Sequence, residues 1–272
     1  QTLAALWCDA HGPPRDADGR TALADRLAAY TEKAAREAKQ QTSWINPNTD
    51  YEEDLEAFVR GVTTDPETPA VLDEFAVQLA EAGFANRLSQ LAMKGTAPGV
   101  PDVYRGTEGA DLSLVDPDNR RPVDWEARRS ALDDLAPLLD DPSADAVQSL
   151  FADPDPRAYL YLTARLLRWR RDHPALAAAE GYVDLAPEGK GAEDWLAFGR
   201  FMGADDTPDT ALLTIVARHP LTRDPDAPAT LPLPGTLSGR AWREVLTGDP
   251  IECGDVIEMQ SLPTAQVTVL ES

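Results

Sequence analysis

Six acidic residues gather in one short stretch of the chain: Asp102, Glu108, Asp111, Asp116, Asp118 and Asp124. Two carboxylates held about 5–5.5 Å apart can act as nucleophile and proton donor, which cleavage of a glycosidic bond with retention requires. A structural role is also open, because DPDNRRPVD (116–124) is typical of an Asx-turn loop closed by arginine–carboxylate pairs. We therefore predict a mainly structural role for Asp116, Asp118, Asn119, Arg120, Arg121 and Asp124.

The acidic stretch belongs to a longer segment, Phe84 to Trp125, whose pattern indicates how the acids are positioned. The segment begins as a helix, breaks at TAPG (96–99) and continues as a short apolar strand, Val100 to Tyr104. A polar loop at the carboxyl end of a buried strand is how a (β/α) barrel builds the rim of its active site. We therefore predict that this segment forms the rim of a functional site.

Several side chains of the chain have the chemistry to bind a neutral sugar. Tyr104, at the end of the predicted strand, can stack on a sugar ring, and Lys94 can donate to a hydroxyl group or bind helix carbonyls. Trp44 stands beside Asn46 and Asn48, which together offer an apolar ring face with amide donors and acceptors. A tryptophan that packs two helices together explains the same pattern, so both interpretations stay open.

The overall composition restricts the classes of partner. The 272 residues carry 25 Lys and Arg against 47 Asp and Glu, a net charge of −22, which repels nucleic-acid phosphates and anionic membrane surfaces. Cys8, Cys253 and three scattered histidines, His11, His173 and His219, provide no disulfide framework, metal spacing or catalytic triad. We expect no metal, no cofactor, no nucleic-acid partner and no membrane association, and we expect a cytoplasmic protein.

Apolar residues at helical spacing dominate the chain up to about residue 178. We predict a helix over 21–40 with Thr21 as its N-cap, a helix that follows Asp50 as its N-cap, and a helix over 70–94. The amphipathic segment 156–176 is the clearest helix, and Pro156 suits its first turn. Its arginines are expected to form a solvated face with ion pairs rather than a phosphate site: Arg165, Arg168, Arg170 and Arg171.

From about residue 180 the pattern changes to short apolar or alternating runs. They occur at 195–202, 211–219, 229–234, 241–248, 255–260 and 265–271, and Pro, Gly and Asp turns separate them. This spacing is typical of a β-sandwich. We predict three parts: helices of an insertion at 1–83, a last barrel strand with its loop and final helices at 84–179, and a β-sandwich at 180–272.

Four segments carry a resemblance to a known family. MKGTAPGVPDVYRGTE (93–108) resembles the eighth-strand signature of the α-amylase superfamily, G-x-P-x-x-Y-x-G-x-E. The continuation DLSLVDPDNRRPVDW (111–125) is much more specific. Together with TSWINPN (42–48) and LLRWRRDHPAL (166–176) before a β region, it resembles the maltooligosyltrehalose synthase family. The resemblance spans nearly the whole chain and is densest at 41–60 and 84–125.

The resemblance implies an activity. Members of this family isomerise the reducing-end α-1,4 linkage of a maltooligosaccharide to α,α-1,1, by intramolecular transglucosylation with a retaining double displacement. In the family the nucleophile, the acid/base and the stabilising acid precede the segment at which this chain starts, and the His-Asp dipeptide that carries the stabilising acid does not occur here. We therefore expect no catalytic residue in this chain, which would supply pocket and structural parts and be inactive alone.

The resemblance also implies which residues bind substrate. They are Trp44, Asn46, Asn48, Lys94, Tyr104, Arg105, Glu108 and Asp111. Two positions depart from the family pattern, which usually has Gln where Arg105 stands and Leu-Trp where Gly109-Ala110 stand. Loss of the tryptophan removes a stacking plane from that part of the loop.

The implied fold class is α+β and multi-domain: the carboxyl-terminal part of a (β/α)8 barrel with a mostly helical insertion, followed by the β-sandwich. The expected partners are a maltooligosaccharide, the amino-terminal remainder of the same enzyme and maltooligosyltrehalose trehalohydrolase. Gln1 falls inside a predicted helix with no Met before it, so we expect a processed chain or a piece of a longer one. Two alternatives stay open: another glycosidase of the superfamily, and a non-catalytic carbohydrate-binding or structural module.

Overall fold

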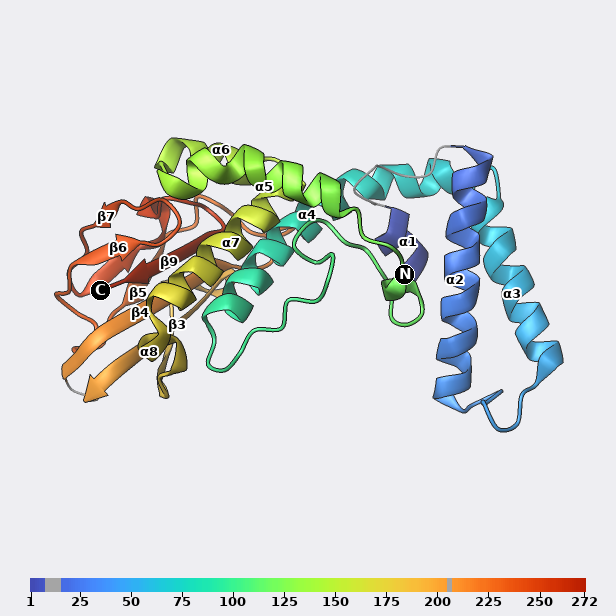
Figure 1. The fold of residues 1–272 in the computed structure, drawn as a ribbon, viewed down its shortest axis with the longest axis horizontal. Helices are drawn as coiled ribbons and strands as arrows, with labels where there is room; N and C mark the ends of the chain where they lie inside the picture. Colours follow the sequence, from blue (N-terminus) through green and yellow to red (C-terminus); the bar gives the residue numbers. More distant parts are fainter. Residues whose placement is uncertain (8–15, 205–206) are drawn as a thin grey trace. The chain divides into compact units, whose positions relative to one another are not determined.

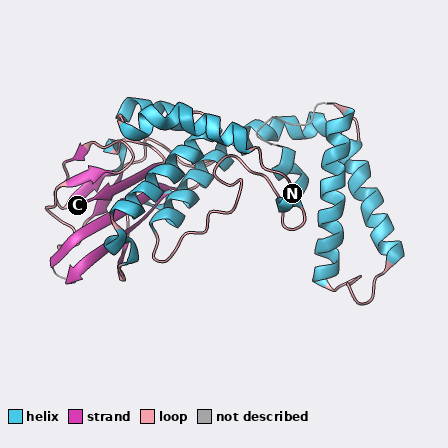
Figure 2. Ribbon diagram, viewed as in Figure 1, coloured by secondary structure: helices cyan, strands magenta, loops and turns pink. Residues whose placement is uncertain are grey.

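The computed structural model describes residues 1–7, 16–204 and 207–272, so Cys8 and His11 lie outside the described residues. Helices fill the first two thirds of the chain and strands the last third (Figures 1 and 2). The predicted change from helix to strand near residue 180 is confirmed. None of the helices in the described part is long and apolar enough to cross a membrane.

The helices are α1 (Thr2–Trp7), α2 (Ala17–Ala38), α3 (Thr49–Thr64), α4 (Thr68–Thr96), α5 (Trp125–Asp140), α6 (Ala144–Ala152), α7 (Pro156–Asp172) and α8 (Pro174–Ala178). The strands are β1 (Gly181–Leu185), β2 (Glu188–Gly189), β3 (Trp195–Ala204), β4 (Thr207–Ala217), β5 (Ala229–Pro232), β6 (Trp242–Glu244), β7 (Pro250–Ile251), β8 (Val256–Glu258) and β9 (Val267–Glu271).

The contacts divide the chain into two compact units. The first, here the helical unit, consists of residues 1–80 and 110–123, and the second, the mixed unit, consists of residues 81–109 and 124–272. The three predicted parts divide the chain at 83/84 and 179/180, whereas the two units divide it at 80/81, 109/110 and 123/124. The helix α4 runs through residue 83 without a break, and α7 is hydrogen-bonded to the β region within the mixed unit.

The helical unit is built on the neighbouring helices α2 and α3 and has a core of its own. Leu23 and Leu27 of α2 pack in this core with Leu6 and Trp7 of α1 and Ala76 of α4. The indole Nε1 of Trp7 donates to Asp73 Oδ1 at 2.8 Å, which satisfies the one polar atom of a side chain that is 1% exposed.

Both predicted N-caps of this unit are wrong by a few residues. The helix α2 begins four residues earlier than expected, because Asp16 accepts a hydrogen bond from Gly19 N at 2.7 Å and caps it. The helix α3 is capped by Asn48, whose Oδ1 accepts from Tyr51 N, and Asp50 lies in its first turn. Asp and Asn cap equally well, so composition alone did not decide between neighbouring candidates.

The β region of the mixed unit contains two antiparallel sheets. One has six strands in the order β1-β3-β4-β9-β6-β7, and the other has three in the order β2-β5-β8. Leu213 and Ile215 of β4 share one apolar core with Leu231 of β5 and Ile257 of β8. Alternating residues of both sheets thus point into the same core. This is the arrangement of a β-sandwich, in which two sheets pack face to face. Strands β1, β2 and β7 were not predicted.

The helix α7 joins the β region to the other helices of the mixed unit (Figure 1). Its predicted apolar face, which contains Tyr159, Leu162, Leu166 and Trp169, is buried as expected. The hydroxyl of Tyr161, on a neighbouring position, donates to Leu246 O at 2.6 Å. Burial raises the pKa of Tyr161 to about 12, so this hydroxyl remains a donor at every physiological pH.

The prediction of a strand over Val100–Tyr104 is wrong. In the structure this segment is an irregular loop after the end of α4, and Val100 is 95% exposed. A strand is stabilised by the ladder it forms with a neighbour, and the β region described here makes its ladders within residues 181–271.

Candidate substrate-binding loops

Asp118 is the most tightly held of the acids in the loop of the helical unit, residues 110–123. Its carboxylate is bound by the fork of Arg26 from α2, with Nε–Oδ1 at 2.9 Å and Nη2–Oδ2 at 3.0 Å. Leu114 N donates to the same group at 2.7 Å. Burial acts to raise the pKa of Asp118, but these hydrogen bonds outweigh it and hold the pKa below its ordinary value. A carboxylate so engaged supports the loop.

The other charged residues of 116–121 form local contacts. Arg120 binds Asp116 with Nε–Oδ1 at 3.1 Å and Nη2–Oδ2 at 2.8 Å, and this hydrogen bonding lowers the pKa of Asp116. Arg121 donates through Nε to the backbone oxygen of Asp118 at 3.1 Å. Asn119 is half-buried, and its Oδ1 is shielded without a hydrogen-bond partner among the described residues.

Two other acids, Asp124 and Asp111, fix backbone conformation. Asp124, in the mixed unit, is the N-cap of α5 and accepts from Ala127 N at 2.9 Å. Asp111, in the helical unit, accepts from Ser113 N at 2.8 Å, which forms an Asx turn at the start of the loop. Asp124 is thus a helix cap in the structure, where an arginine pair was expected.

Trp44 lies in the α2–α3 connection and is 54% exposed. Its Nε1 donates to Glu37 Oε1 at 3.0 Å, and the guanidinium of Arg36 lies 4.8 Å from the ring centroid. Arg36 also binds Glu52 with two parallel hydrogen bonds of 2.8 and 2.7 Å. The ring is therefore held in place from the side of α2 and still presents surface to solvent.

The connection around Trp44 is closed by a chain of side-chain hydrogen bonds. Thr42 donates to Glu52, and Asn48 N donates to Thr42 Oγ1 at 3.0 Å. Hydrogen bonds from Arg36 and Thr42 lower the pKa of Glu52 to about 2. Asn48 is committed to capping α3, whereas Asn46 is exposed and bonds through its backbone to Ser43.

The remaining candidates lie in the mixed unit, at the end of α4 and in the loop after it. Lys94 is exposed in the last turn of α4, Tyr104 is 44% exposed, and Arg105 is also exposed. Glu108 is half-buried, and its Oε2 is shielded and has no hydrogen-bond partner among the described residues. The predicted substrate-binding residues are thus divided between the two units. Lys94, Tyr104, Arg105 and Glu108 lie in the mixed unit, and the helical unit contains Trp44, Asn46, Asn48 and Asp111.

Two arginines that the sequence pattern did not single out bind the backbone of this loop. Arg87 Nη2 of α4 donates to Thr107 O at 3.3 Å and to Gly109 O, and Arg128 Nη2 of α5 donates to Gly106 O at 3.3 Å. A local pattern could not reveal them, because each lies about twenty residues from its partners. The structure adds both residues to the site.

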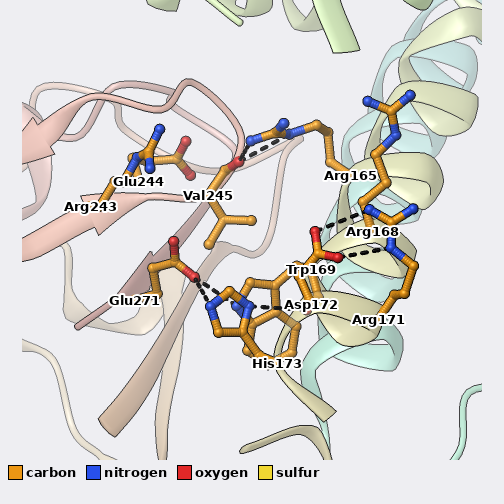
Figure 3. A pocket seen from close by; sticks show the side chains of 10 residues that line it. All are labelled: Arg165, Arg168, Trp169, Arg171, Asp172, His173, Arg243, Glu244, Val245 and Glu271. Atoms are coloured by element: carbon orange, nitrogen blue, oxygen red, sulfur yellow. Dashed lines mark hydrogen bonds and ion pairs between the residues drawn. The ribbon is translucent and has the colours of Figure 1, made fainter. Parts of the chain in front are cut away.

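A cavity of about 290 Å³ in the mixed unit is lined by the last turns of α7 and by β6 and β9 (Figure 3). Trp169 Nε1 donates to Glu271 Oε2 at 2.9 Å, and His173 Nε2 lies 3.6 Å from the same oxygen. The Trp169 and His173 rings stack with centroids 5.6 Å apart. Arg165 points across to Val245 O of the β region. These contacts tie α7 to the sheet.

The four arginines of α7 that were predicted to form a solvated face divide into two pairs. Arg168 and Arg171 form exposed ion pairs with Asp140 and Asp172, as predicted. Arg165 and Arg170 differ from the prediction, because the hydrogen bonds described for them go to backbone carbonyls, whereas Arg168 combines such a bond to Leu139 O with its ion pair. Arg170 donates to Gly95 O at 3.1 Å and to Gly99 O, next to the end of α4, where carbonyl groups lack helical partners.

Comparisons with known proteins place the chain in a family, although no family model matches it. A maltooligosyl trehalose synthase of Mycobacterium tuberculosis (strain CDC 1551) is 34% identical over 246 residues, 89% of this chain and 28% of that protein. Its counterpart in strain H37Rv matches equally. The solved maltooligosyltrehalose synthase of Arthrobacter ramosus has a TM-score of 0.69 at 32% identity and covers 92% of this chain.

A further solved maltooligosyl trehalose synthase gives a TM-score of 0.64 at 26% identity. The chain spans 28–30% of the length of these relatives. Similarity of this extent along nine tenths of the chain, with agreement of the fold, is what common descent produces. The chain belongs to the maltooligosyltrehalose synthase family, of which it corresponds to a partial region.

Proposed function

We propose that the chain is the carboxyl-terminal part of an enzyme that converts the reducing-end α-1,4 linkage of a maltooligosaccharide to α,α-1,1. The observation that carries this proposal is the 34% identity over 89% of the chain to a maltooligosyl trehalose synthase. In that enzyme residues 100–104, which form an irregular loop in this structure, would pair with the preceding strands as the last strand of a (β/α)8 barrel. The β region of the mixed unit is then the domain that follows the barrel in the sequence.

The contacts of three acids in this chain support structural rather than catalytic roles for them. Asp116 is bound by Arg120, Asp118 is bound by Arg26, and Asp124 caps α5. Acids engaged in this way are poor nucleophiles and poor proton donors, since ionic and amide partners stabilise the carboxylate. The contacts of these three acids favour structural roles, and together with the family resemblance they support our assignment of the nucleophile and the acid/base to the remainder of the enzyme, with this chain supplying the pocket.

The chemistry requires that water be kept from the reacting carbon. In a retaining double displacement, the terminal bond is cleaved to a glycosyl-enzyme intermediate, and the released glucose turns over and attacks through its anomeric hydroxyl. Hydrolysis wins if water reaches the intermediate first. The exposed ring of Trp44 in the helical unit and that of Tyr104 in the mixed unit are each, taken separately, suited to stack on a sugar and to shield it from water.

The experiment uses the intact enzyme and maltopentaose. The wild type is expected to form a non-reducing isomer, and Trp44→Ala and Tyr104→Ala are each expected to raise the share of hydrolysis products severalfold. Tyr182→Ala is the control, because Tyr182 is a similarly exposed aromatic residue that belongs to β1 and to neither candidate loop. An unchanged ratio of isomer to hydrolysis products in both variants would rule out the role given to the two rings.

The same proposal sets the expected partners and place of action. The product is a non-reducing maltooligosyl trehalose, which a trehalohydrolase would consume in trehalose biosynthesis in the cytoplasm. The purified chain of residues 1–272 is expected to be inactive by itself. Conversion of maltopentaose by that chain alone would contradict the assignment of the catalytic acids to the missing part.

A further inference from the structure

The loop that follows the predicted rim strand closes on itself by backbone contacts. Thr107 donates through its backbone N and its Oγ1 to Tyr104 O, at 3.0 and 2.6 Å. Gly109 N donates to Gly106 O at 3.4 Å. Gly106 has a φ of +88°, which favours glycine. Residues 104–109, here the turn loop, are thus a compact turn rather than an extended linker.

The turn loop is fixed from outside by the two guanidinium groups of Arg87 and Arg128. Between them they bind the carbonyl oxygens of Gly106, Thr107 and Gly109. Arg87 is itself held, because its guanidinium lies 4.4 Å from the centroid of the buried Tyr159 ring on α7. The backbone of the loop is therefore attached to α4 and α5, and through Arg87 to α7.

Gly109 shows how closely Arg128 approaches the loop. A Cβ atom at position 109 would lie 2.6 Å from Arg128 Cζ and 2.8 Å from its Nη1. Gly109 is not among the glycines with positive φ, so its backbone conformation is open to any residue. A side chain at position 109 would displace the guanidinium of Arg128 from its place at the loop, which makes positions 109 and 128 interdependent.

The side chains of the turn loop differ in their surroundings from its backbone. Tyr104 and Arg105 are exposed, and Glu108 carries a shielded oxygen without a hydrogen-bond partner in the described part of the chain. Arg128 Nε is likewise a shielded donor with no such partner. A sugar hydroxyl both donates and accepts, so it can satisfy a carboxylate oxygen and a guanidinium N–H. Shielded polar atoms of this kind call for an explanation.

We propose that Arg87 and Arg128 are positioning residues of the sugar pocket, and that the Gly109–Arg128 contact sets the conformation in which Tyr104, Arg105 and Glu108 meet the substrate. This inference rests on the proposed function, because it takes a neutral maltooligosaccharide as the ligand. Arg87 and Arg128 act through the loop and not on the reacting atoms.

The test measures equilibrium binding of maltopentaose to the intact enzyme, together with its conversion. Arg87→Met and Arg128→Ala each remove charge-assisted hydrogen bonds to the loop and are expected to weaken binding about tenfold. Arg128→Lys keeps the charge without the planar fork and is expected to recover only part of the affinity. Because the catalytic groups are untouched, the rate constant at saturation should fall less than the affinity does.

A double-mutant comparison separates the proposal from simple loss of stability. Gly109→Ala forces Arg128 to move and is expected to weaken binding about as much as Arg128→Ala does, whereas adding it to Arg128→Ala should cause no further loss. Gly235→Ala is the matched control, because nothing lies within 4 Å of a Cβ placed there.

The outcomes distinguish this inference from the proposed function. Wild-type binding without formation of a non-reducing product would overturn the proposed function and leave the positioning role to be judged by the variants. Full affinity in Gly109→Ala and Arg128→Ala, or additive losses in the double variant, would overturn the positioning role alone. A wild type that does not bind maltopentaose would overturn both.

Discussion

At the scale of single residues, Glu244 of β6 is an unusual carboxyl group, because its side chain is fully buried in the β region. Oε1 accepts from Val269 N at 3.0 Å, and Oε2 accepts from Thr247 N at 2.5 Å. Burial raises the pKa of Glu244 to about 7, although these amide hydrogen bonds act in the opposite direction. The group therefore changes charge near neutral pH.

The raised pKa predicts that stability depends on pH. The folded protein keeps the proton of Glu244 between the ordinary value of 4.5 and about 7, where the unfolded chain has lost it. The free energy of unfolding should thus be highest below pH 4.5 with respect to this group and fall by about 3 kcal/mol as the pH rises through 7. Urea unfolding between pH 5 and 8 measures this change.

Glu244→Gln provides the comparison for that measurement. Glutamine does not titrate, so the variant should lack the loss of stability between pH 5 and 8, although its NH2 group would face one of the two backbone donors, Val269 N or Thr247 N, and lower stability equally at every pH. A variant whose stability falls with pH as steeply as that of the wild type would show that another group is responsible.

The residue-level roles in the acidic loop were predictable only where the partners are close in sequence. The Asp116–Arg120 pair spans four residues and could be expected from DPDNRRPVD. Arg26 is 92 residues from Asp118, and no local pattern indicates such a pair. The same holds for Arg87 and Arg128, because the sequence does not show which carbonyl groups the fold leaves without partners.

At the scale of elements, Arg200 of β3 joins the ends of two helices. Its side chain is fully buried, and its guanidinium donates to Thr96 O at 3.1 Å at the end of α4. It also donates to Ala177 O at 3.3 Å and to Ala179 O at the end of α8. Burial lowers the pKa of Arg200 below its usual range, and the carbonyl oxygens supply the polar contacts that a buried cation needs.

Replacement of Arg200 should destabilise the mixed unit strongly. Arg200→Met leaves carbonyl groups at both helix ends buried without partners, so the free energy of unfolding is expected to fall by about 3–5 kcal/mol. Arg200→Lys should retain part of the stability. The control is Arg218→Ala, since Arg218 is exposed just after β4 and its loss should cost less than about 0.5 kcal/mol. Equal Tm values for Arg200→Met and Arg218→Ala would refute the argument.

The elements themselves were predictable to different degrees. The helices α2 and α7 follow from apolar spacing, because burial of one face dominates their stability, whereas α4 was predicted although its Phe75 and Leu79 are exposed. The short strands β2 and β7 were missed, since two residues give no periodicity to detect. The segment 100–104 has a strand composition but no ladder in this structure, which shows that β structure depends on partners more than on propensity.

At the scale of the whole chain, the two units have separate cores. Leu23, Leu27 and Trp7 belong to the core of the helical unit, and Leu213 and Leu231 to that of the mixed unit. Units with separate cores open with their own free energies, which amide hydrogen exchange resolves segment by segment.

Separate opening predicts that destabilising substitutions act on one unit at a time. Asp118→Asn breaks the buried pair with Arg26 in the helical unit and should cost about 2–4 kcal/mol, seen as faster hydrogen exchange in α2 with little change in β4. Arg200→Met should show the opposite distribution. Asp25→Asn is the control for Asp118→Asn, because the Asp25–Arg60 pair is exposed and contributes little. If Asp118→Asn and Arg200→Met each accelerated hydrogen exchange equally in α2 and in β4, the chain would open as one cooperative body. The separate cores would then not set its stability.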